Sequence, residues 1–381
     1  MNYKKGIKIL TVILIILIVC AGGVSYALYG TYTDLKANPI AAFNTPQPST
    51  AATDDVNFDA NADVETVTID GKTYQKNPNV VSILMLGIDW DGTEVKDATG
   101  ARSDMIMLCT IDMENNGISF LSIPRDTRTI VHKVDQKTGK VESKEYLTKL
   151  NHAYILGGGN DTTKWGPQNA MRATEDLVEI DGQLSIPIQY YISIDLEHLA
   201  DLAAALGGVE VTLDQNYPDI GSKGDTITLE GNAVRLYLQN RKQMDDGEMS
   251  RQRHEQEFMM AIAKKIKKLG AVQSASKLFS QLSGDVLQTN LGLDQIVAMA
   301  GVLDKLGSID NIKMETFEER DDSWQNFPDP IVTNPSKLNY FVMDEDELMS
   351  KMLERYYTPL SAAGGTTAFS ASESPDAEDE E

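Results

Sequence analysis

The sequence predicts an α/β fold in which a central mixed β-sheet is flanked by helices on both faces (α/β/α). Aliphatic runs of strand length follow one another at 80–88, 105–111 and 117–123, with polar connectors between them. Further along the chain, strand-like apolar runs alternate irregularly with longer segments of helical periodicity. Irregular alternation favours a mixed sheet that is covered on both sides.

The N-terminus has the pattern of a membrane anchor. Residues 1–8 contain the only basic side chains before Lys36, and residues 9–29 are almost entirely apolar. About 20 such residues span a bilayer, and flanking lysines stay on the cytoplasmic side. We therefore expect a transmembrane helix with residues 1–8 in the cytoplasm and the rest outside the cell membrane. A cleaved signal peptide is the alternative, although no clean cleavage motif follows the apolar stretch.

A single large domain is expected at 64–358, with its recognisable motifs at 80–258. Residues 30–63 are rich in Ala, Asn, Thr, Pro and Asp and predict an extended extracytoplasmic linker. Residues 359–381 are acidic, carry no basic side chain and predict a disordered tail. The Asp-Gly pair at Asp70 predicts a small hairpin at the start of the domain.

The remaining elements follow from apolar spacing and from residues that start and end helices. Asp195 is a good N-cap, and the glycine pair after Leu206 suits a helix end. We expect 135–147 to be a polar excursion and 157–159 to form a turn. The predicted helices are 167–180, 196–206, 231–240, 248–269, 274–283, 293–306 and 337–355, and the further strands are 188–194, 209–213 and 311–317.

The composition limits the classes of function. The chain has 381 residues and a net charge of −23, which argues against a nucleic-acid partner because such partners need a basic face. Its two cysteines, Cys20 and Cys109, lie in the predicted anchor and in a predicted core strand, so we expect no disulfide and no zinc site. An exported chain without a disulfide fits a Gram-positive-type cell surface.

Polar side chains stand where the first aliphatic runs end or begin. Asp89 ends the first run, Arg102 and Asp104 begin the second, and Arg125 and Asp126 follow the third. If consecutive strands pair antiparallel, these positions share one edge of the sheet. Their alternation along a strand puts Arg102 and Asp104 on one face. Carboxylates among arginines suit a phosphate and a metal that prefers oxygen ligands, such as Mg²⁺ or Mn²⁺.

A simpler interpretation exists for each of these residues alone. Asp89 is acceptable as a turn residue, and Arg125 can form an internal ion pair with Asp104 or Asp126. Alternatively, Arg125 is fixed by the preceding proline and binds phosphate through both arms of its guanidinium. Because several short polar segments are expected to meet at one edge of the sheet, we favour the functional interpretation, a site for phosphate and a metal.

A second basic segment lies further along the chain. Arg251 and His254 are three residues apart on a predicted helix and share one face, and Arg241 ends the preceding helix. We expect Arg241 and Arg251 to bind phosphate. A solvated face paired with glutamates is the interpretation for Arg235 and for Arg253.

Taken in order, these strings resemble the LytR-CpsA-Psr family. The resemblance covers roughly 80–258 and includes SILMLGID, ARSDMIML, SFLSIPRDT, KLNHAY, YYISIDL and ALGGVEV. It implies a membrane-anchored phosphotransferase on the outer face of the cell membrane. Such an enzyme moves a glycan phosphate from a polyprenyl-pyrophosphate carrier onto peptidoglycan, with help from Mg²⁺. The polymer is wall teichoic acid, capsule or a similar glycan.

The resemblance also assigns roles by motif position. Asp89 and Asp104 are the implied metal ligands, and Arg125, Asp104 and Asp126 are the implied catalytic group, with either aspartate as the base. The chain departs from the family at Gln239 and at His254, where Arg253 is an alternative to His254. The implied pyrophosphate-binding residues are Arg102, Arg125, Lys149, Arg241 and Arg251.

Two other functions remain open at this point. One is a non-catalytic envelope protein that binds lipid-linked phosphates or wall polymer. The other is a metal-dependent pyrophosphatase or phosphodiesterase, which would release free phosphate or glycan without an acceptor.

Overall fold

The computed structural model of the chain describes 35, 38–43, 65–89, 101–135, 137–158, 165–180, 182, 184, 186–239, 247–282, 287–332 and 337–360. The predicted anchor, most of the linker, Arg241 and almost all of the acidic tail lie outside these residues. Within them, no helix combines the length and the apolar character needed to cross a membrane.

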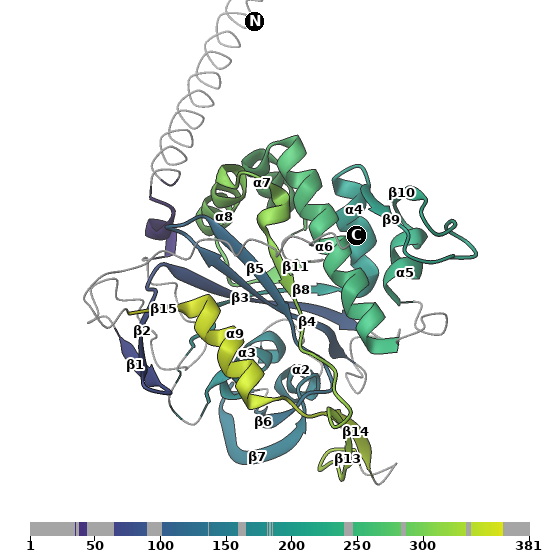
Figure 1. The fold of residues 1–381 in the computed structure, drawn as a ribbon. Helices are drawn as coiled ribbons and strands as arrows, with labels where there is room; N and C mark the ends of the chain where they lie inside the picture. The colour runs from purple at the N-terminus through teal and green to yellow at the C-terminus, as the bar shows by residue number, and fades with distance from the viewer. Residues whose placement is uncertain are drawn as a thin grey trace, which may run out of the picture.

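The main sheet has six strands in the order β11-β8-β3-β4-β5-β12 (Figure 1). Pairs β3–β4, β4–β5 and β8–β11 are antiparallel, and pairs β3–β8 and β5–β12 are parallel. The sheet is therefore mixed, as predicted. The strands are β3 (Val80–Asp89), β4 (Arg102–Asp112), β5 (Gly117–Ser122), β8 (Tyr190–Asp195), β11 (Leu287–Thr289) and β12 (Lys313–Glu315).

Helices cover both faces of this sheet, which confirms the three-layer prediction (Figure 1). One face packs against α4 (Leu199–Ala205), α5 (Asn232–Gln239), α6 (Gly247–Leu269), α7 (Ala271–Leu282) and α8 (Leu293–Lys305). The other face packs against α2 (His152–Gly158), α3 (Trp165–Val178) and α9 (Glu345–Tyr356).

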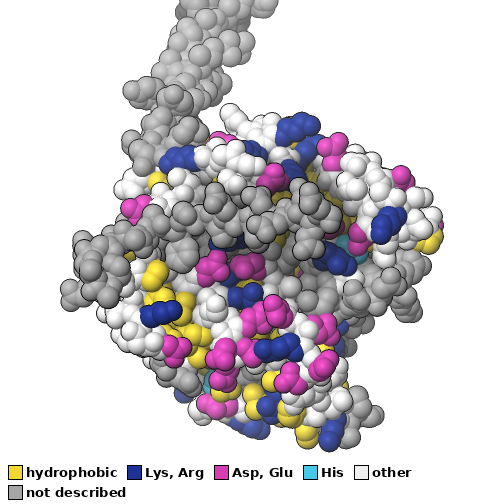
Figure 2. Space-filling view, in the orientation of Figure 1, with side chains coloured by type: hydrophobic (Ala, Val, Ile, Leu, Met, Phe, Trp, Pro, Cys, Tyr) yellow, Lys and Arg dark blue, Asp and Glu magenta, His cyan; other side chains and the backbone are white. Residues whose placement is uncertain are grey.

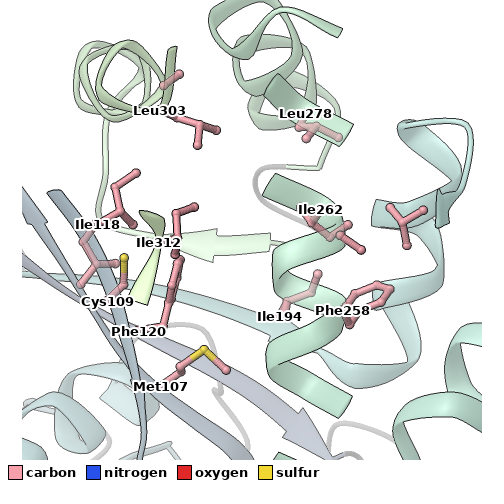
Figure 3. Packing of buried hydrophobic residues seen from close by; sticks show 14 of the residues in the cluster. Met107, Cys109, Ile118, Phe120, Ile194, Phe258, Ile262, Leu278, Leu303 and Ile312 are labelled. Atoms are coloured by element: carbon pink, nitrogen blue, oxygen red, sulfur yellow. The ribbon is translucent and has the colours of Figure 1, made fainter. Parts of the chain in front are cut away.

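Strand β4 shows why both faces need a cover. Met107 and Cys109 point into the first core, with Phe258 of α6 across from them (Figure 3), whereas Ile106 and Leu108 belong to the second core. This alternation is the two-residue period of a strand whose two sides are both buried. Burial raises the pKa of the Cys109 thiol to about 12, so this cysteine is an uncharged core residue.

Smaller sheets surround the main one. In one of them β2 (Lys72–Lys76) lies between β1 (Thr66–Ile69) and β15 (Tyr357–Pro359). The others are two-stranded and pair β6 (Arg128–Val134) with β7 (Val141–Lys149), β9 (Val209–Thr212) with β10 (Thr226–Leu229), and β13 (Trp324–Phe327) with β14 (Leu338–Phe341). Short 3₁₀ turns are η1 (Pro39–Phe43), η2 (Leu196–His198) and η4 (Ile309–Asn311). The predicted hairpin at Asp70 is confirmed, because Asp70 and Gly71 have φ values of 49° and 74° between β1 and β2.

Two of the predicted helix boundaries are confirmed. The Asp195 side chain accepts a hydrogen bond from the backbone N–H of Glu197 at 2.9 Å and caps η2, which leads into α4. Gly207 and Gly208 follow α4 with φ values of 71° and 76°, a conformation that glycine adopts without a side-chain clash.

The polar excursion predicted at 135–147 is wrong, because most of it belongs to β7. The first half of this strand is exposed and carries charged residues such as Glu142 and Lys144, whereas Tyr146 and Thr148 near its end are buried. The strand pairs only with β6, so few of its residues need to be apolar, and its hydrophobic pattern is correspondingly weak.

The turn predicted at 157–159 is also wrong where it can be compared, since Gly157 and Gly158 end helix α2. A Cβ on Gly157 would lie 2.4 Å from the backbone oxygen of Trp165 in α3. The glycine is therefore required by the close approach of two helices.

The last predicted helix begins too early. Strand β14 occupies 338–341, and α9 starts only after Asp344, whose side chain accepts from the backbone N–H of Glu347 at 2.7 Å. The N-cap at Asp344 marks the true start of the helix.

Candidate functional site

The ends of β3, β4 and β5 meet at one edge of the sheet, as the sequence predicts. Asp89 at the end of β3 pairs with Arg102 at the start of β4. Past the end of β5, the backbone N–H of Ile123 still donates to the carbonyl of Ile106 in β4 at 2.9 Å. The chain that follows, with Arg125, is thereby kept beside the start of β4.

A β-bulge changes the direction of one predicted site residue. Ile88 pairs with Ser103 and Gly87 pairs with Met105, so Asp104 is the extra residue between the two rungs. The two-residue alternation assumed for Arg102 and Asp104 is therefore wrong here. Arg102 is exposed, whereas Asp104 is 4% exposed and lies under the site.

Arg125 forms an ion pair with Asp104 through Nη1. The side chains of Arg125 and Asp104 are 18% and 5% exposed, so the pair is largely removed from water. This is the internal pair that the sequence offered as an alternative to phosphate binding. The two roles are compatible, because a carboxylate that holds one arm of a guanidinium also fixes its orientation.

Lys149 extends this charged group. Its Nζ lies 2.8 Å from Asp126 Oδ1, and Asp126 Oδ2 lies 3.9 Å from Nε of Arg125. The result is a row of alternating charges, Lys149–Asp126–Arg125–Asp104, which we call the charge row. Its members come from the end of β7, from the segment after β5 and from the bulge in β4.

Asn151 belongs to the same place, although sequence reasoning did not select it. Its backbone N–H donates to the carbonyl of Arg125 at 3.0 Å, and its Nδ2 lies 3.5 Å from Oδ1 of Asp104. Among the residues described, the buried amide oxygen of Asn151 has no hydrogen-bond partner. The sequence feature that could have indicated Asn151 is its position in the segment KLNHAY, two residues after Lys149.

The second basic segment lies on α6. Arg251 and Glu255 form an ion pair one helical turn apart, and both are buried, at 3% and 4% exposure. Helix α6 is fixed to the same end of the sheet, because Gln256 Nε2 donates to Ser122 Oγ at 2.9 Å and to the Glu315 carbonyl at 2.8 Å. A phosphate role for Arg251 and for Arg241 stays a prediction.

His254 and Arg253 have different surroundings. His254 is fully buried, with Nε2 3.1 Å from Asp214 Oδ2 and 3.0 Å from the Tyr217 hydroxyl. The side chain of Arg253 is 52% exposed and lies 3.8 Å from the same aspartate. His254 thus belongs to a buried polar cluster between α6 and the segment after β9.

The pKa of His152, the first residue of α2, reflects its burial and the charged side chains around the site. Burial lowers its pKa to about 4; nearby Asp329 opposes this shift, while Arg102 and Lys149 add to it. His152 is therefore neutral at pH 7. Two predicted pyrophosphate-binding cations, one from β4 and one from β7, act on the same imidazole.

Some of the oxygen donors that a small divalent cation needs lie at this edge of the sheet. Mg²⁺ is usually held by one or two carboxylates, with phosphate and water oxygens completing its shell. Asp104 supplies one carboxylate, and the amide of Asn151, whose oxygen is unpartnered, lies beside it, whereas Asp89 stands at the end of the neighbouring strand β3. Within the described part of the chain, no three or more His, Cys, Asp or Glu side chains are grouped so that they could hold a metal ion by themselves.

The surface outside this edge is less informative. Figure 2 shows acidic and basic side chains intermixed on the face that it presents. A cavity of about 310 Å³ lies beside the start of β3 and the end of β4, at the opposite end of these strands from the charge row. Its lining residues are Asn38, Pro39, Ile40, Asn79, Met113, Glu114 and Lys305.

Comparison with known proteins identifies the family. The model described as the LytR_cpsA_psr family matches residues 42–350. A Bacillus cereus protein, the polyisoprenyl-teichoic acid–peptidoglycan teichoic acid transferase TagU, is 31% identical over 240 residues, covering 60% of this chain and 69% of that protein.

Two solved structures have a similar fold. Protein gbs0355 from Streptococcus agalactiae gives a TM-score of 0.54 at 22% identity, covering 76% of this chain and 91% of that chain. TagV of B. subtilis gives a TM-score of 0.53 at 20% identity, covering 73% and 97%. The family match spans most of this chain and extends beyond the motifs on which the resemblance was based. The chain belongs to the LytR-CpsA-Psr family.

Proposed function

We propose that this chain is a membrane-anchored transferase that moves a glycan phosphate from a polyprenyl-pyrophosphate carrier onto peptidoglycan. The transferase class agrees with the name of its relative TagU, which acts on polyisoprenyl-linked teichoic acid and peptidoglycan by that name. The observation that carries the proposal is the charge row, with exposed Arg102 beside it, at one edge of the sheet.

This arrangement of several cations suits a pyrophosphate better than it suits a ligand with a single charge. Among the described residues, no carboxylate lies within ion-pair distance of Arg102, and its side chain is exposed to a ligand. Arg125 and Lys149 are each held by an aspartate, which fixes their position before the substrate arrives. Pre-positioned cations stabilise charge that grows on a leaving phosphate without reorganisation during the reaction.

The chain's own residues then have separate roles. Arg102, Arg125 and Lys149 bind the two phosphates and orient the bond that breaks. Asp104 and Asp126 hold Arg125 and Lys149, and either carboxylate can take the proton of the attacking sugar hydroxyl. The attacked phosphorus forms a bond to the acceptor oxygen, and the polyprenyl phosphate leaves with the electrons of the broken P–O bond.

We also propose Mg²⁺, or Mn²⁺, as a cofactor that Asp89 and Asp104 would hold. Such an ion would supply further neutralisation of pyrophosphate charge. Support comes from the oxygen-only donor set and from the unpartnered Asn151 amide oxygen.

The location is part of the same proposal. The apolar segment at 9–29, preceded by lysines, is consistent with a single-pass anchor that leaves the domain outside the cell membrane. A carrier lipid and peptidoglycan are both available there in a Gram-positive-type bacterium.

The test is a transfer assay on the full chain in detergent with a lipid-linked glycan, a peptidoglycan acceptor and Mg²⁺. Arg125→Ala and Asp104→Ala should each reduce transfer by roughly 100-fold or more, since they remove groups that stabilise the transition state. Lys264→Ala on the exposed surface of α6 is the matched control and should retain activity. Full activity of both site variants would contradict the site assignment.

The same assay separates the other two functions. Tight binding of the lipid-linked substrate without any product would indicate a non-catalytic binding protein. Release of free phosphate or free glycan in the absence of an acceptor would indicate a pyrophosphatase or phosphodiesterase.

A further inference from the structure

Asp329 lies in the C-terminal part of the domain, yet its side chain contacts Thr148, the residue that precedes Lys149 of the charge row. The side chain is fully buried, and Oδ2 accepts hydrogen bonds from the hydroxyls of Thr148, at 2.6 Å, and Tyr340. Oδ1 accepts from the backbone N–H groups of Ile331 at 2.7 Å and Val332 at 2.6 Å. One carboxylate therefore receives four hydrogen bonds.

Asp329 is ionised despite its burial. Burial alone would raise its pKa, but the hydrogen bonds from Thr148, Tyr340 and the backbone hold the pKa below its usual value. An ionised carboxylate can only accept, so the Thr148 hydroxyl must donate its single proton to Asp329.

That proton fixes the tautomer of His152. Thr148 Oγ1 lies 2.7 Å from Nδ1 of His152, and because its own proton is directed to Asp329, it can only accept from the ring. Nδ1 of His152 therefore carries a proton. Three residues thus form a directed chain from His152 through Thr148 to Asp329.

The same carboxylate organises both neighbours of Lys149. Thr148 directly precedes Lys149 in β7, and the ring of Tyr340 lies 5.6 Å from the Lys149 ammonium. The residue after Tyr340, Phe341, donates its backbone N–H to the carbonyl of Asp126 at 2.9 Å. Both members of the Lys149–Asp126 ion pair are therefore attached to the segment that Asp329 holds.

We propose that Asp329 is a positioning residue of the transferase site, which fixes Lys149 beside Asp126 and keeps the proton of His152 on Nδ1. This rests on the proposed function only in that Lys149 is taken as a phosphate-binding residue. Asp329 touches no substrate and acts through Thr148 and Tyr340.

The first test does not depend on catalysis. Imidazole ¹⁵N NMR of the full chain in detergent distinguishes the two neutral tautomers, and the chain has only four histidines to assign. Wild type should show the proton of His152 on Nδ1. In Asp329→Asn, the new amide oxygen would still accept from the backbone N–H groups of Ile331 and Val332, and the amide NH₂ group would donate to the Thr148 hydroxyl. The Thr148 hydroxyl would then donate to Nδ1, and the ring proton would move to Nε2.

The second test asks whether Asp329 acts through Lys149. Asp329→Asn should lower kcat/KM for transfer by roughly 10- to 100-fold, as residues that orient a binding group do. In a Lys149→Met background, the same change should cost less than about threefold, because the residue through which it acts has been removed. A purely structural role would cost the same factor in both backgrounds.

A matched control excludes a general loss of stability. Asp344→Ala removes the N-cap of α9 in the same C-terminal region without touching the network, and it should lower Tm without changing kcat/KM. A wild-type His152 with its proton on Nε2, or equal losses in both backgrounds, would overturn the inference. Absence of transfer by the wild-type chain, with the tautomer change still seen in Asp329→Asn, would count against the proposed function and support the positioning network.

Discussion

The Asp104–Arg125 pair shows how far the sequence predicts the site at the scale of single residues. The polar strings at 89, 102–104 and 125–126 predict a shared edge, and the structure brings them together. The bulge at Asp104 was not predictable, because nothing in RSDM differs from an ordinary strand start. Asn151 was missed for a similar reason: an uncharged amide gives no sign of chemistry until its neighbours are known.

Removing one partner of this pair should cost more stability than removing both. Arg125→Met leaves the buried Asp104 carboxylate without its cation and should lower the free energy of unfolding by roughly 3 kcal/mol. Adding Asp104→Asn removes the stranded charge and should restore part of that loss. Urea denaturation of both variants tests this, and a double variant that is less stable than Arg125→Met would contradict it.

Glu175 on α3 should make stability depend on pH. Burial raises its pKa from 4.5 to about 7, although its Oε1 accepts from the backbone N–H of Ile188 at 2.7 Å. A carboxyl whose pKa is higher in the folded state stabilises the fold below its unfolded pKa. That contribution is lost as pH rises through the folded value, here between 4.5 and about 7.

Glu175→Gln keeps the acceptor oxygen and removes the titration. The variant should be more stable than wild type by roughly 1–3 kcal/mol at about pH 8 and equally stable at about pH 4. Urea denaturation at the two pH values measures the difference. A stability difference that does not change with pH would show that Glu175 does not titrate in this range.

At the scale of elements, prediction succeeded where burial dictates the residues. Strands β3, β4 and β5 are buried on both faces and are recognisable by their aliphatic runs. Strand β7 was missed because it belongs to a two-stranded ribbon and is mostly exposed, with charged residues on both faces. Helix α2 was missed because it has only seven residues and two of them are glycines, which are unfavourable within a helix.

The crossing of α2 and α3 gives a test at this scale. Gly157→Ala would place a Cβ 2.4 Å from the backbone oxygen of Trp165, so the two helices would have to separate, at a cost of roughly 1–3 kcal/mol. The adjacent Gly158 has 3.4 Å to its nearest neighbour and serves as the matched control. Gly158→Ala should be neutral or slightly stabilising, because alanine favours helix. Thermal unfolding compares them, and equal Tm values would refute the packing argument.

At the scale of the whole molecule, the three-layer arrangement could be predicted from the sequence, but the part that the C-terminal segment plays in supporting the site could not. Irregular alternation of strands and helices is enough to predict a covered mixed sheet. Asp329 and Thr148, in contrast, are 181 residues apart, and no local pattern links them. The C-terminal segment joins the site through hydrogen bonds between residues that are far apart in the sequence and close only in the folded chain.

The overall charge leads to a last prediction. The net charge of −23 opposes an anionic substrate at long range, whereas the cations of the site attract it at short range. Long-range repulsion is screened by salt, with a Debye length of about 30 Å at 0.01 M and about 10 Å at 0.1 M. Residues 361–381 contribute acidic side chains and no basic one, so they add only to the repulsion.

Changing the tail carboxylates at 373, 376 and 378–381 to amides should therefore tighten binding of inorganic pyrophosphate severalfold at low salt and have little effect at high salt. Calorimetric titration of the full chain at both salt concentrations measures this. Exchanging serines of the same tail for threonines is the control, since it alters sequence without altering charge. Equal affinities at low salt would show that tail charges do not reach the site. A difference that persists at high salt would indicate direct contact between tail and site, because screening removes only the long-range part of the interaction.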